Sequence, residues 1–582
     1  MYTWSLSSLY ESFNETYSND FNTLKELTNE MNTLATNLHC ISDLENWYKL
    51  DTEYSTLATK LVGFTTLTLS ADTTNEEGSK WMTKLQPLLS NTTLAYSNYK
   101  KFIIDNKDNI DEWVNTNEII ASQSFNIGEI LENAEYLLDS NVESVISKLK
   151  INASNAWSKL QSHLTSLSKV EFDNQTLTLA ALRNLAYSPD QEIRKRAYEA
   201  EIELYASIED AVAFSLNSIK GEVNVINELR GYSSPIQKTL IDSRMSKPTL
   251  DALIQAIENY LPVFRKYFKH KASLLGHSNG LPWYDLFAPF ETKEPKSYTV
   301  EESKKFIIDS FSSFSPELAE MTRKAYDEKW IDFYPREGKR GGAFCYNLAP
   351  VKESRILTNY GESISDIITL AHELGHAYHG MQIENLSILN TDYTMPVAET
   401  ASTLCENIVF NAAMKTVGDD EKLVLIENSI SDLAQITVDI LSRYKFETEV
   451  FERRKNQFLF PNDLKEIMLQ AQRDTYGDGL DQNCMHPYMW VNKGHYYSAG
   501  LSFYNFPYAF GGLFALGLYS QYEVEGASFV EKYNKLLQAT TTATCEDVAM
   551  MADIDVTKVS FWESSLKVVE KRIEDFISLT SN

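Results

Sequence analysis

The sequence is poor in residues that break helices and in residues that cross-link chains. It has 15 prolines and 22 glycines among 582 residues, too few for many tight turns. Its five cysteines are scattered and form no CxxC pair, so the sequence predicts neither a disulfide framework nor a thiolate zinc site. The first twenty residues have no basic stretch leading into an apolar run, which is not typical of a secretory signal. We therefore expect a helical protein of a reducing compartment, the cytoplasm.

Positive charge is also scarce. The 53 lysines and arginines stand against 81 aspartates and glutamates, which gives a formal net charge of −28 at pH 7. Such a charge favours solubility and repels phosphate backbones and anionic lipid surfaces. We therefore expect neither a nucleic acid nor a membrane as partner.

Long uncharged runs are rare, and the longest one needs a separate explanation. No charged residue occurs from Tyr496 to Tyr522, a length sufficient to cross a bilayer, which takes about 20 residues. Asn505, Pro507 and several glycines interrupt this stretch, and two glutamates follow it. The pattern favours a buried helix that lines a polar cavity over a membrane span.

Helical periodicity is what the chain has in abundance. Leu, Ile, Ala, Lys and Glu recur at spacings of three and four residues, and the length and 43% hydrophobic content suffice for two or more lobes. The segment Ser188-Pro189-Asp190-Gln191 offers a cap residue followed by proline at the first helical position. We predict a helix from this point and place a domain boundary between residues 187 and 188.

The clearest departure from helical periodicity is the segment 339–360. Paired glycines, β-branched or aromatic residues and a central proline predict a short hairpin there. After it, Ser363 can cap a new helix with Asp366 three residues on, so we predict a helix over 363–382.

That predicted helix carries His372, Glu373 and His376. Residues four apart lie one turn above each other on a helix, so the two histidines can direct an imidazole nitrogen at one metal ion. A catalytic zinc site requires a third protein ligand, and the next predicted helix, TMPVAETASTLCENIVF, offers Glu399. Two turns later, Glu406 could accept a hydrogen bond from a liganding imidazole.

Other interpretations of this motif are weaker. The metzincin pattern requires a glycine and a third histidine at the positions that His379 and Gln382 occupy here. We expect His379 to be a hydrogen-bonded helix residue near the site. A structural zinc ion usually has four protein ligands, and only three are evident. The non-functional alternative is a surface helix with two solvated histidines that bind no metal.

The stretch ITLAHELGHAYHG followed by PVAETASTLCEN resembles the oligoendopeptidase F branch of the thimet oligopeptidase family of zinc peptidases. Similar segments occur along nearly the whole chain: WSLSSLY, AYSPDQEIRKRAYEA, LPWYDLFAP, GKRGGAFC, FYNFPYAFGGLFALGLY and IDVTKVSFW. The resemblance implies a mainly α protein whose two helical lobes enclose a deep substrate channel, with a small β hairpin or sheet near a single Zn²⁺ per chain. It also implies short peptides as substrates, an N-terminal helical lobe in residues 1–187 and a catalytic zinc peptidase domain in 188–582.

The resemblance also implies roles for individual residues. The zinc ligands fall on His372, His376 and Glu399, and the general base on Glu373. The segment HYYSAGLSFYNFPYAFGG would place His495, Tyr504 and Tyr508 near the substrate carbonyl, with Tyr497 as a further candidate. Gly341, Gly342 and Ala343 match the edge strand that binds an extended peptide through its backbone.

These residues suffice for peptide hydrolysis. Zinc lowers the pKa of a bound water from about 15.7 to about 7, Glu373 accepts the released proton, and tyrosine or histidine donors help to hold the oxyanion. The leading hypothesis is a zinc endopeptidase that cleaves internal bonds of short oligopeptides. A related exopeptidase that removes dipeptides or single residues stays open, as does a non-catalytic helical peptide-binding protein with a structural zinc.

Overall fold

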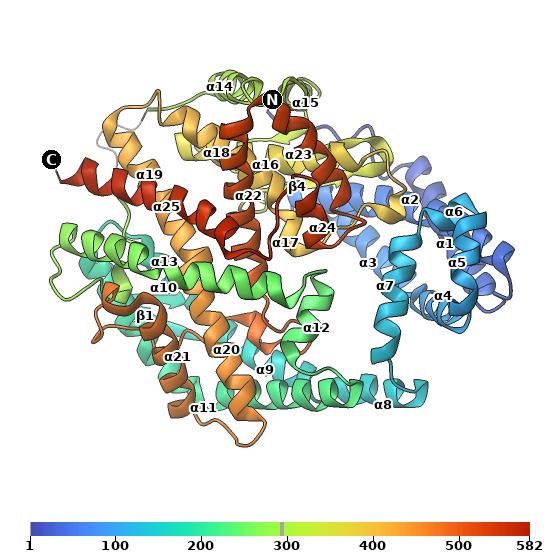
Figure 1. The fold of residues 1–582 in the computed structure, drawn as a ribbon, viewed down its shortest axis with the longest axis horizontal. Helices are drawn as coiled ribbons and strands as arrows, with labels where there is room; N and C mark the ends of the chain where they lie inside the picture. The colour runs from blue at the N-terminus through green and yellow to red at the C-terminus, as the bar shows by residue number, and fades with distance from the viewer. Residues whose placement is uncertain (1, 291–295, 582) are drawn as a thin grey trace. The chain divides into compact units, whose positions relative to one another are not determined.

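The computed structural model describes residues 2–290 and 296–581, and almost all of their regular structure is α-helical (Figure 1). The chain divides into two compact units. Unit 1 comprises Met1–Glu135, Lys296–Ala413 and Gln521–Asp553, and unit 2 comprises Tyr136–Pro295, Met414–Ser520 and Ile554–Asn582. The predicted mainly α fold with a small sheet is confirmed. The predicted channel and the boundary after residue 187 stay predictions.

Unit 1 begins with a bundle of helices and continues with the segment that carries the histidine motif. Its helices are α1 (Glu15–Ala35), α2 (Ile41–Ala71), α3 (Glu76–Ser90), α4 (Thr93–Asp105), α5 (Ile110–Thr116), α6 (Glu118–Ala121), α7 (Ser124–Asn133), α14 (Val300–Ser312), α15 (Pro316–Asp327), α16 (Ile364–Ile383), α17 (Met395–Ala398), α18 (Thr400–Ala413), α23 (Ala527–Ala539) and α24 (Cys545–Met550).

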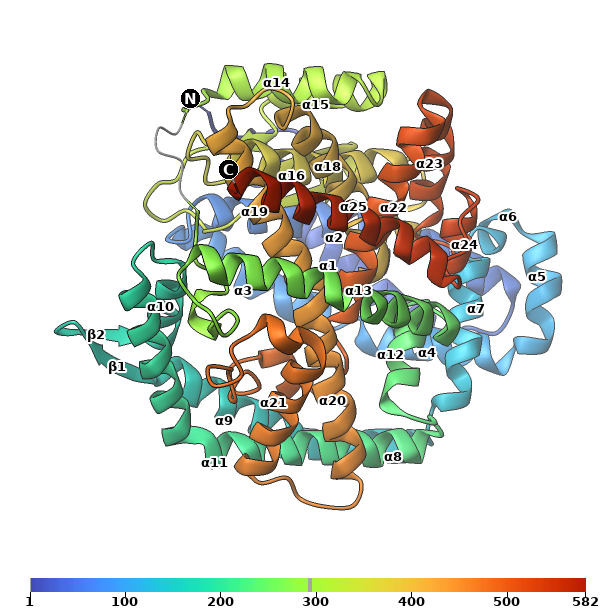
Figure 2. The ribbon, with the colours of Figure 1, turned by 60° about the vertical axis from the view of Figure 1, so that its left-hand side comes forward.

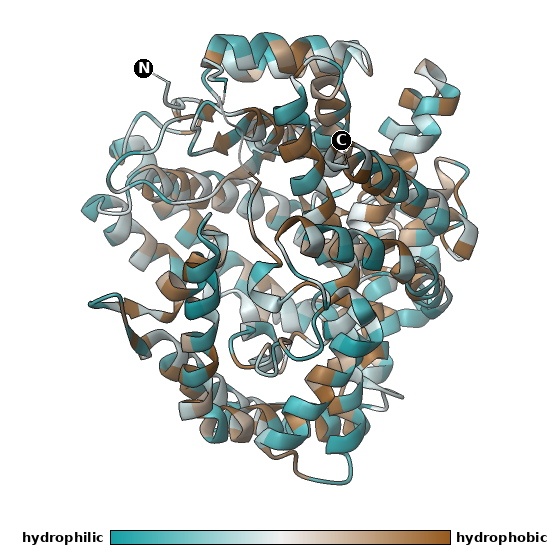
Figure 3. Ribbon diagram, turned by 90° about the vertical axis from the view of Figure 1, so that its left-hand side faces the viewer, coloured by the Kyte–Doolittle hydropathy of each residue, from teal (hydrophilic) through white to brown (hydrophobic). Residues whose placement is uncertain are grey.

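Apolar spacing explains how the first helices pack. On α1, Tyr17, Leu24 and Met31 recur every two turns and are fully buried against α2, which contributes Trp47 and Leu61 to the same core. The opposite faces of such helices are hydrophilic, and Figure 3 shows both kinds of residue along most of the helices. Burial of one face therefore holds the bundle together.

A three-stranded sheet lies in unit 1, in the order β3 (Ile331–Asp332), β5 (Glu353–Leu357), β4 (Phe344–Leu348). β4 and β5 form the predicted antiparallel hairpin, with Phe344 opposite Leu357. β3 pairs with β5 in parallel, which the sequence did not indicate. Among the described residues, β4 pairs with β5 alone and is an edge strand.

Unit 2 contains the longest helix and a two-stranded hairpin. Its elements are α8 (Ser140–Lys150), α9 (Ser154–Leu167), β1 (Lys169–Phe172), β2 (Gln175–Thr178), α10 (Leu179–Asn184), α11 (Gln191–Arg230), α12 (Pro235–Asp242), α13 (Lys247–Leu274), α19 (Asp419–Ala434), α20 (Ile440–Arg454), α21 (Pro461–Tyr476) and α25 (Val559–Thr580). Helix α22 (Phe506–Glu525) contains the boundary between the two units.

Helix α11 begins two residues later than its sequence predicts. The cap is Asp190, whose carboxylate accepts hydrogen bonds from the backbone of Glu192 and Ile193, rather than Ser188. Helices α9 and α20 pack against α11 (Figure 2). Between α19 and α20 the chain forms one π-helical turn, Gln435–Asp439.

Within residues 2–290 and 296–581, every helix is too short or too polar to span a bilayer.

Candidate metal centre

Helix α16 is fixed at its first turn by the predicted cap. The Ser363 hydroxyl accepts a hydrogen bond from the Asp366 backbone at 3.1 Å, and the Asp366 carboxylate accepts from the Ser363 backbone at 2.9 Å. The predicted helix is thereby confirmed. Two turns further on, the rings of His372 and His376 lie with their centroids 5.0 Å apart.

Glu399 lies at the junction of α17 and α18 rather than inside one continuous helix. Its backbone departs from helical geometry, with φ −89° and ψ 5°, so the chain turns between the two helices. Its carbonyl still accepts a hydrogen bond from the backbone of Thr403, which makes Glu399 the first residue to join the ladder of α18. The side chain therefore projects from the start of α18.

The three predicted ligands converge within unit 1. Oε2 of Glu399 lies 3.2 Å from Nε2 of His372 and 3.5 Å from Nε2 of His376. One donor atom from each of these residues lies within 4.8 Å of the other two. The Ser402 hydroxyl donates a hydrogen bond of 2.6 Å to the same Glu399 oxygen and so fixes the orientation of the carboxylate.

Close contact between α16 and α18 brings these side chains together. A Cβ on Gly375 would lie 2.5 Å from the carbonyl oxygen of Ala401, so only glycine allows the two backbones to approach this far. From the other side, the amide of Asn347 on β4 donates to the His376 carbonyl at 3.3 Å. Sequence reasoning missed Gly375, Asn347 and Ser402, although a glycine inside a helical motif was a visible signal for close packing.

Glu406 occupies the position expected of an outer partner. Its Oε2 lies 3.2 Å from Nδ1 of His372, while Nε2 of the same ring faces Glu399. A hydrogen bond at Nδ1 fixes the ring and leaves Nε2 to bind a cation.

The electrostatics of the cluster are those of a cation site. Burial alone would lower the pKa of His372, but Glu399 and Glu406 raise it to about 10. Burial lowers the pKa of His376 to about 4, with the charge of Glu399 opposing this effect. Burial alone would raise the pKa of Glu399, whereas its contacts with the two histidines hold it at about 2. The two carboxylates thus attract positive charge to the ring nitrogens.

Glu373 lies close enough to His372 and Glu399 to interact with both electrostatically. It is only 6% exposed, and burial raises its pKa to about 7, with the charge of His372 acting in the opposite direction. A carboxyl group with a pKa near neutrality can both accept and release a proton at physiological pH.

The donor set fits a zinc ion. Two imidazole nitrogens and one carboxylate oxygen are the ligands of many catalytic zinc sites. The side chains of His372, His376 and Glu399 are 28%, 19% and 30% exposed, so solvent reaches the fourth position. The residues therefore suit a catalytic site rather than a closed structural one.

His379 has the structural role that we expected. It is fully buried, its Nε2 lies 2.8 Å from the Thr540 hydroxyl, and its ring stacks on Tyr393 at 4.2 Å. Burial lowers its pKa to about 3.

The predicted tyrosine and histidine segment belongs to unit 2. Nε2 of His495 lies 2.7 Å from the amide nitrogen of Asn505, and its ring stacks on Tyr504. The hydroxyls of Tyr504 and Tyr508 are 2.9 Å apart. Tyr497 is instead fully buried and donates to the carbonyl of Trp490, so it packs as a core residue. That His495, Tyr504 and Tyr508 lie near the substrate carbonyl stays a prediction.

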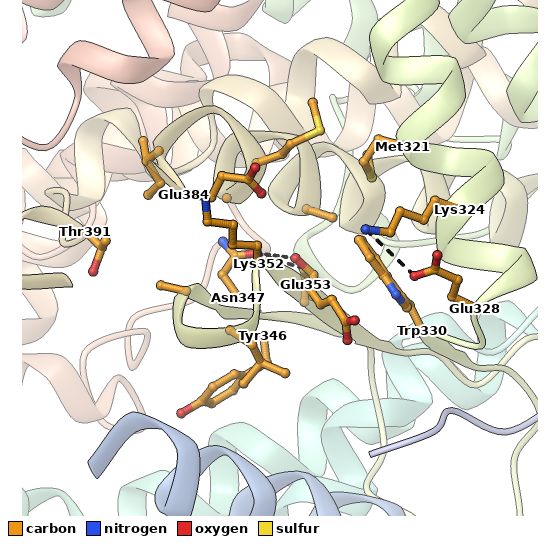
Figure 4. Close-up of a pocket in the computed structure, with 18 of the residues that line it drawn as sticks. Met321, Lys324, Glu328, Trp330, Tyr346, Asn347, Lys352, Glu353, Glu384 and Thr391 are labelled. Carbon is orange, nitrogen blue, oxygen red and sulfur yellow. Dashed lines mark hydrogen bonds and ion pairs between the residues drawn. The ribbon is translucent and has the colours of Figure 1, made fainter. Parts of the chain in front are cut away.

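Gly341, Gly342 and Ala343 lie immediately before edge strand β4. Gly342 has φ +80°, a conformation that favours glycine, and its carbonyl accepts from the Asn359 amide at 2.8 Å. Residues of β4 also border the large cavity of unit 1, about 1080 Å³, which Figure 4 shows. Its wall includes Met321, Lys324, Trp330, Tyr346, Asn347 and Glu384, and the described lining contains none of the three candidate ligands.

Comparison with known proteins agrees with this geometry. The pattern of "Peptidase family M3" matches residues 184–568, and that of "Oligopeptidase F" matches residues 106–167. The chain is 28% identical over 411 residues to the chromosomal oligoendopeptidase F of Lactococcus lactis subsp. cremoris, covering 69% of this chain and 66% of that protein. It is 25% identical over 592 residues to an oligoendopeptidase F homologue of Borreliella burgdorferi, covering 98% and 97%.

Solved structures share the fold. A crystal structure of a protein from Chlamydophila abortus superimposes with a TM-score of 0.87 at 20% identity, covering 99% of this chain and 98% of that one. Oligoendopeptidase F from Enterococcus faecium gives a TM-score of 0.71 at 18% identity, covering 98% and 99%.

The family match over more than half of the chain, together with the two imidazoles and the carboxylate gathered in unit 1, defines a metallopeptidase. Within that class, the chain belongs to peptidase family M3.

Proposed function

We propose that this peptidase is a zinc-dependent endopeptidase that hydrolyses internal bonds of short oligopeptides. The observation that carries the proposal is the convergence of donor atoms from His372, His376 and Glu399 within 4.8 Å of one another. Glu373, the neighbour of His372 in the sequence, interacts electrostatically with His372 and Glu399. The names of the relatives support oligopeptides as the substrate class. The five cysteines, all free, suit the cytoplasm as its location.

His372, His376 and Glu399 would hold one Zn²⁺. When bound, the ion supplies a Lewis acid that polarises a carbonyl and acidifies a water molecule. Ser402 holds the carboxylate of Glu399 in place, and Glu406 holds the ring of His372. These outer contacts keep the ligand geometry ready before a substrate arrives.

Glu373 is the residue that moves protons. Its buried carboxylate accepts a proton from the attacking water and then transfers it to the departing amine nitrogen, because a free amine leaves more readily than an amide anion. Its pKa of about 7 suits both steps.

Donors in unit 2 would assist on the carbonyl side. The hydroxyls of Tyr504 and Tyr508 share a hydrogen bond of 2.9 Å, and phenol hydroxyls are suitable donors to a developing oxyanion. Burial, together with neighbouring cations, lowers the pKa of His495 to about 3, which keeps the ring neutral at pH 7. Removal of one such donor typically costs about 100-fold or more in rate.

The edge strand would bind the substrate backbone. The outer side of β4 has no partner strand among the described residues, and an extended peptide can pair with it, starting at Gly341, Gly342 and Ala343. Such backbone pairing depends little on the side chains of the peptide.

The test is a Glu373→Gln variant assayed with an internally quenched peptide blocked at both ends. We expect the variant to retain zinc and to lose activity by at least about 1000-fold, since the amide cannot accept the proton. Zinc content by atomic emission and cleavage by fluorescence check both parts. Unchanged turnover would rule out Glu373 as the general base.

A Glu399→Ala variant is the comparison for metal binding, since it should lose zinc as well as activity. Cleavage of peptides with free ends but not of the doubly blocked peptide would favour the exopeptidase. Bound zinc without cleavage of any peptide would favour the binding protein.

A further inference from the structure

Unit 2 contains a second cavity, of about 230 Å³, which no step of the proposed reaction uses. It lies between the start of α11, the segment around Trp283, the π-helical turn and the loop before His495. Its volume suits an occupant the size of an amino acid or dipeptide. Its lining includes Tyr198, Glu201, Asp439, Arg443, Tyr476 and Lys493.

Most charges in this cavity are paired. Nε of Arg183 lies 2.9 Å from Oε1 of Glu201, and that carboxylate also accepts from the hydroxyl of Tyr205 at 2.8 Å. Arg443 forms an ion pair with Asp439 on the π-helical turn. Each lining carboxylate therefore already has a cationic partner.

Arg194, another lining residue, is neutralised from outside the cavity. Its Nε lies 2.8 Å from Oδ1 of Asp285, and both side chains are almost fully buried.

Lys493 remains as the unmatched charge. Its mostly buried ammonium forms no hydrogen bond or ion pair with any residue in the described ranges. Burial, and then the charge of Arg443, lower its pKa to about 7. A lysine that is desolvated and lacks a counter-ion costs stability, which indicates a role other than folding.

A further unpaired donor lies in the same lining. Nε of Arg443 is buried without a hydrogen-bond partner among the described residues. Buried donors without acceptors are rare in native proteins, because each one costs desolvation energy. Together with the ammonium of Lys493, this donor indicates an absent acceptor.

The walls determine what kind of acceptor fits. Aromatic rings of Tyr198, Tyr284 and Phe287 border the cavity, so the ligand has an apolar body as well as an anionic group. One surplus positive charge matches a monoanion better than a phosphate, which carries a charge of about −1.5 to −2 at pH 7. The π-helical turn, a feature that often marks functional sites, places Gln435 and Asp439 in the wall.

We propose that this cavity is a carboxylate-binding site, in which Lys493 pairs with the carboxylate of a small organic acid or of a peptide C-terminus. The carboxylate would also accept from the free donor of Arg443, while its organic part contacts the aromatic walls. The proposal is independent of the zinc chemistry, since it requires only residues of unit 2.

The test measures binding to the full-length protein by isothermal titration calorimetry with three probes: sodium acetate, acetyl-dialanine, and acetyl-dialanine amide. We expect acetyl-dialanine to bind and its amide to bind about tenfold or more weakly, because the amide lacks the charge that Lys493 would neutralise. Acetate binding as tightly as acetyl-dialanine would identify small acids as the source of the carboxylate. Tighter binding of acetyl-dialanine would identify the peptide C-terminus.

A Lys493→Met variant locates the site. We expect it to lose at least about tenfold in affinity for acetyl-dialanine, and Lys493→Arg to restore part of the loss. A Lys465→Met variant is the matched control, because Lys465 is also partly buried in unit 2 but pairs with Glu209 outside this cavity. Carboxylate bound at a zinc ion would give the same signal in all four proteins.

Equal affinity of wild type and Lys493→Met for acetyl-dialanine would overturn the proposal. Equal affinity of the wild type for the acid and the amide would also overturn it, and this comparison does not depend on the folding of any variant.

Discussion

Gly375 determines how closely the two metal-binding helices approach. Its missing side chain leaves room for the carbonyl of Ala401, and the Glu399 carboxylate reaches the two imidazoles only because α18 lies this close. Gly375 thus belongs to the site although its own atoms bind nothing. A similar argument applies to Ser402, which holds the carboxylate in one orientation.

Substitution of this glycine should lower both the stability of the protein and its affinity for zinc. We expect Gly375→Ala to lower the free energy of unfolding by about 1–3 kcal/mol, since the added methyl group overlaps a backbone atom that cannot move aside. Zinc affinity should fall as well, because α18 must shift. Denaturant unfolding and a zinc titration measure the two effects.

Gly128→Ala is the control for helix propensity. A Cβ at Gly128, inside α7, meets nothing within 4 Å, so this substitution should stabilise by about 0.5–1 kcal/mol. If Gly375→Ala is equally harmless, the close approach does not limit the site.

Lys493 should make stability depend on pH. Its pKa in the folded protein, about 7, is below the usual value of 10.5, so the unfolded chain binds more protons between these values. The charges that face it are Arg443, Asp439, Arg183 and Glu201. Lys493→Met should therefore raise the free energy of unfolding at pH 7 by an amount on the order of 1–3 kcal/mol, with a difference that vanishes near pH 10.5.

Urea unfolding at pH 7, 8.5 and 10 tests this expectation. Lys465→Met, which loses the pair with Glu209, should show no such gain. A gain from Lys493→Met that stays constant with pH would contradict the assignment.

Helix α16 depends on its first turn, far from the histidines. The reciprocal bonds between Ser363 and Asp366 satisfy backbone groups that would otherwise lack partners. Because the ligands lie two and three turns further on, the cap fixes where the helix begins but does not touch the metal.

Removal of the cap should therefore affect folding more than chemistry. We expect Ser363→Ala to destabilise by about 0.5–2 kcal/mol while zinc stoichiometry stays the same. Ser234→Ala is the comparison, since Ser234 precedes α12 without a side-chain cap bond and its loss should cost little. Thermal unfolding measures the loss of stability in both variants. Equal losses would show that the side-chain hydrogen bonds of Ser363 do not stabilise α16.

Short-range elements of this protein were predictable, and contacts between elements were not. The Ser363 cap and the spacing of His372 and His376 follow from the helical repeat, which the sequence contains directly. Other features depend on residues far away in the sequence. They are the turn at Glu399, the parallel pairing of β3 with β5, and the hydrogen bond from Asn347 to the His376 carbonyl. Charge pairing could not be predicted from the sequence either, since nothing near Lys493 in the sequence shows that its ammonium lacks a partner.

Excess negative charge acts on the protein as a whole. The 81 acidic residues outnumber the 53 lysines and arginines by 28, so at least 28 carboxylates have no cation to pair with, and the excess charges repel one another. Salt screens such repulsion, with a Debye length of about 10 Å at 0.1 M. We expect the unfolding temperature to rise by a few degrees when NaCl increases from 10 to about 200 mM.

Sucrose at equal osmolality is the control for effects on water activity. An unfolding temperature that falls with NaCl would show that attractive surface pairs outweigh the repulsion.

Helix α22 and the order of the six segments have a consequence for synthesis. The first unit lacks its last residues until Asp553 has been made, and the second until the chain ends. Neither unit can therefore finish folding before its last segment has been synthesised, and each unit is assembled from three segments that are separated in the sequence. A truncation before Gln521 would therefore remove the last segment of both units at once.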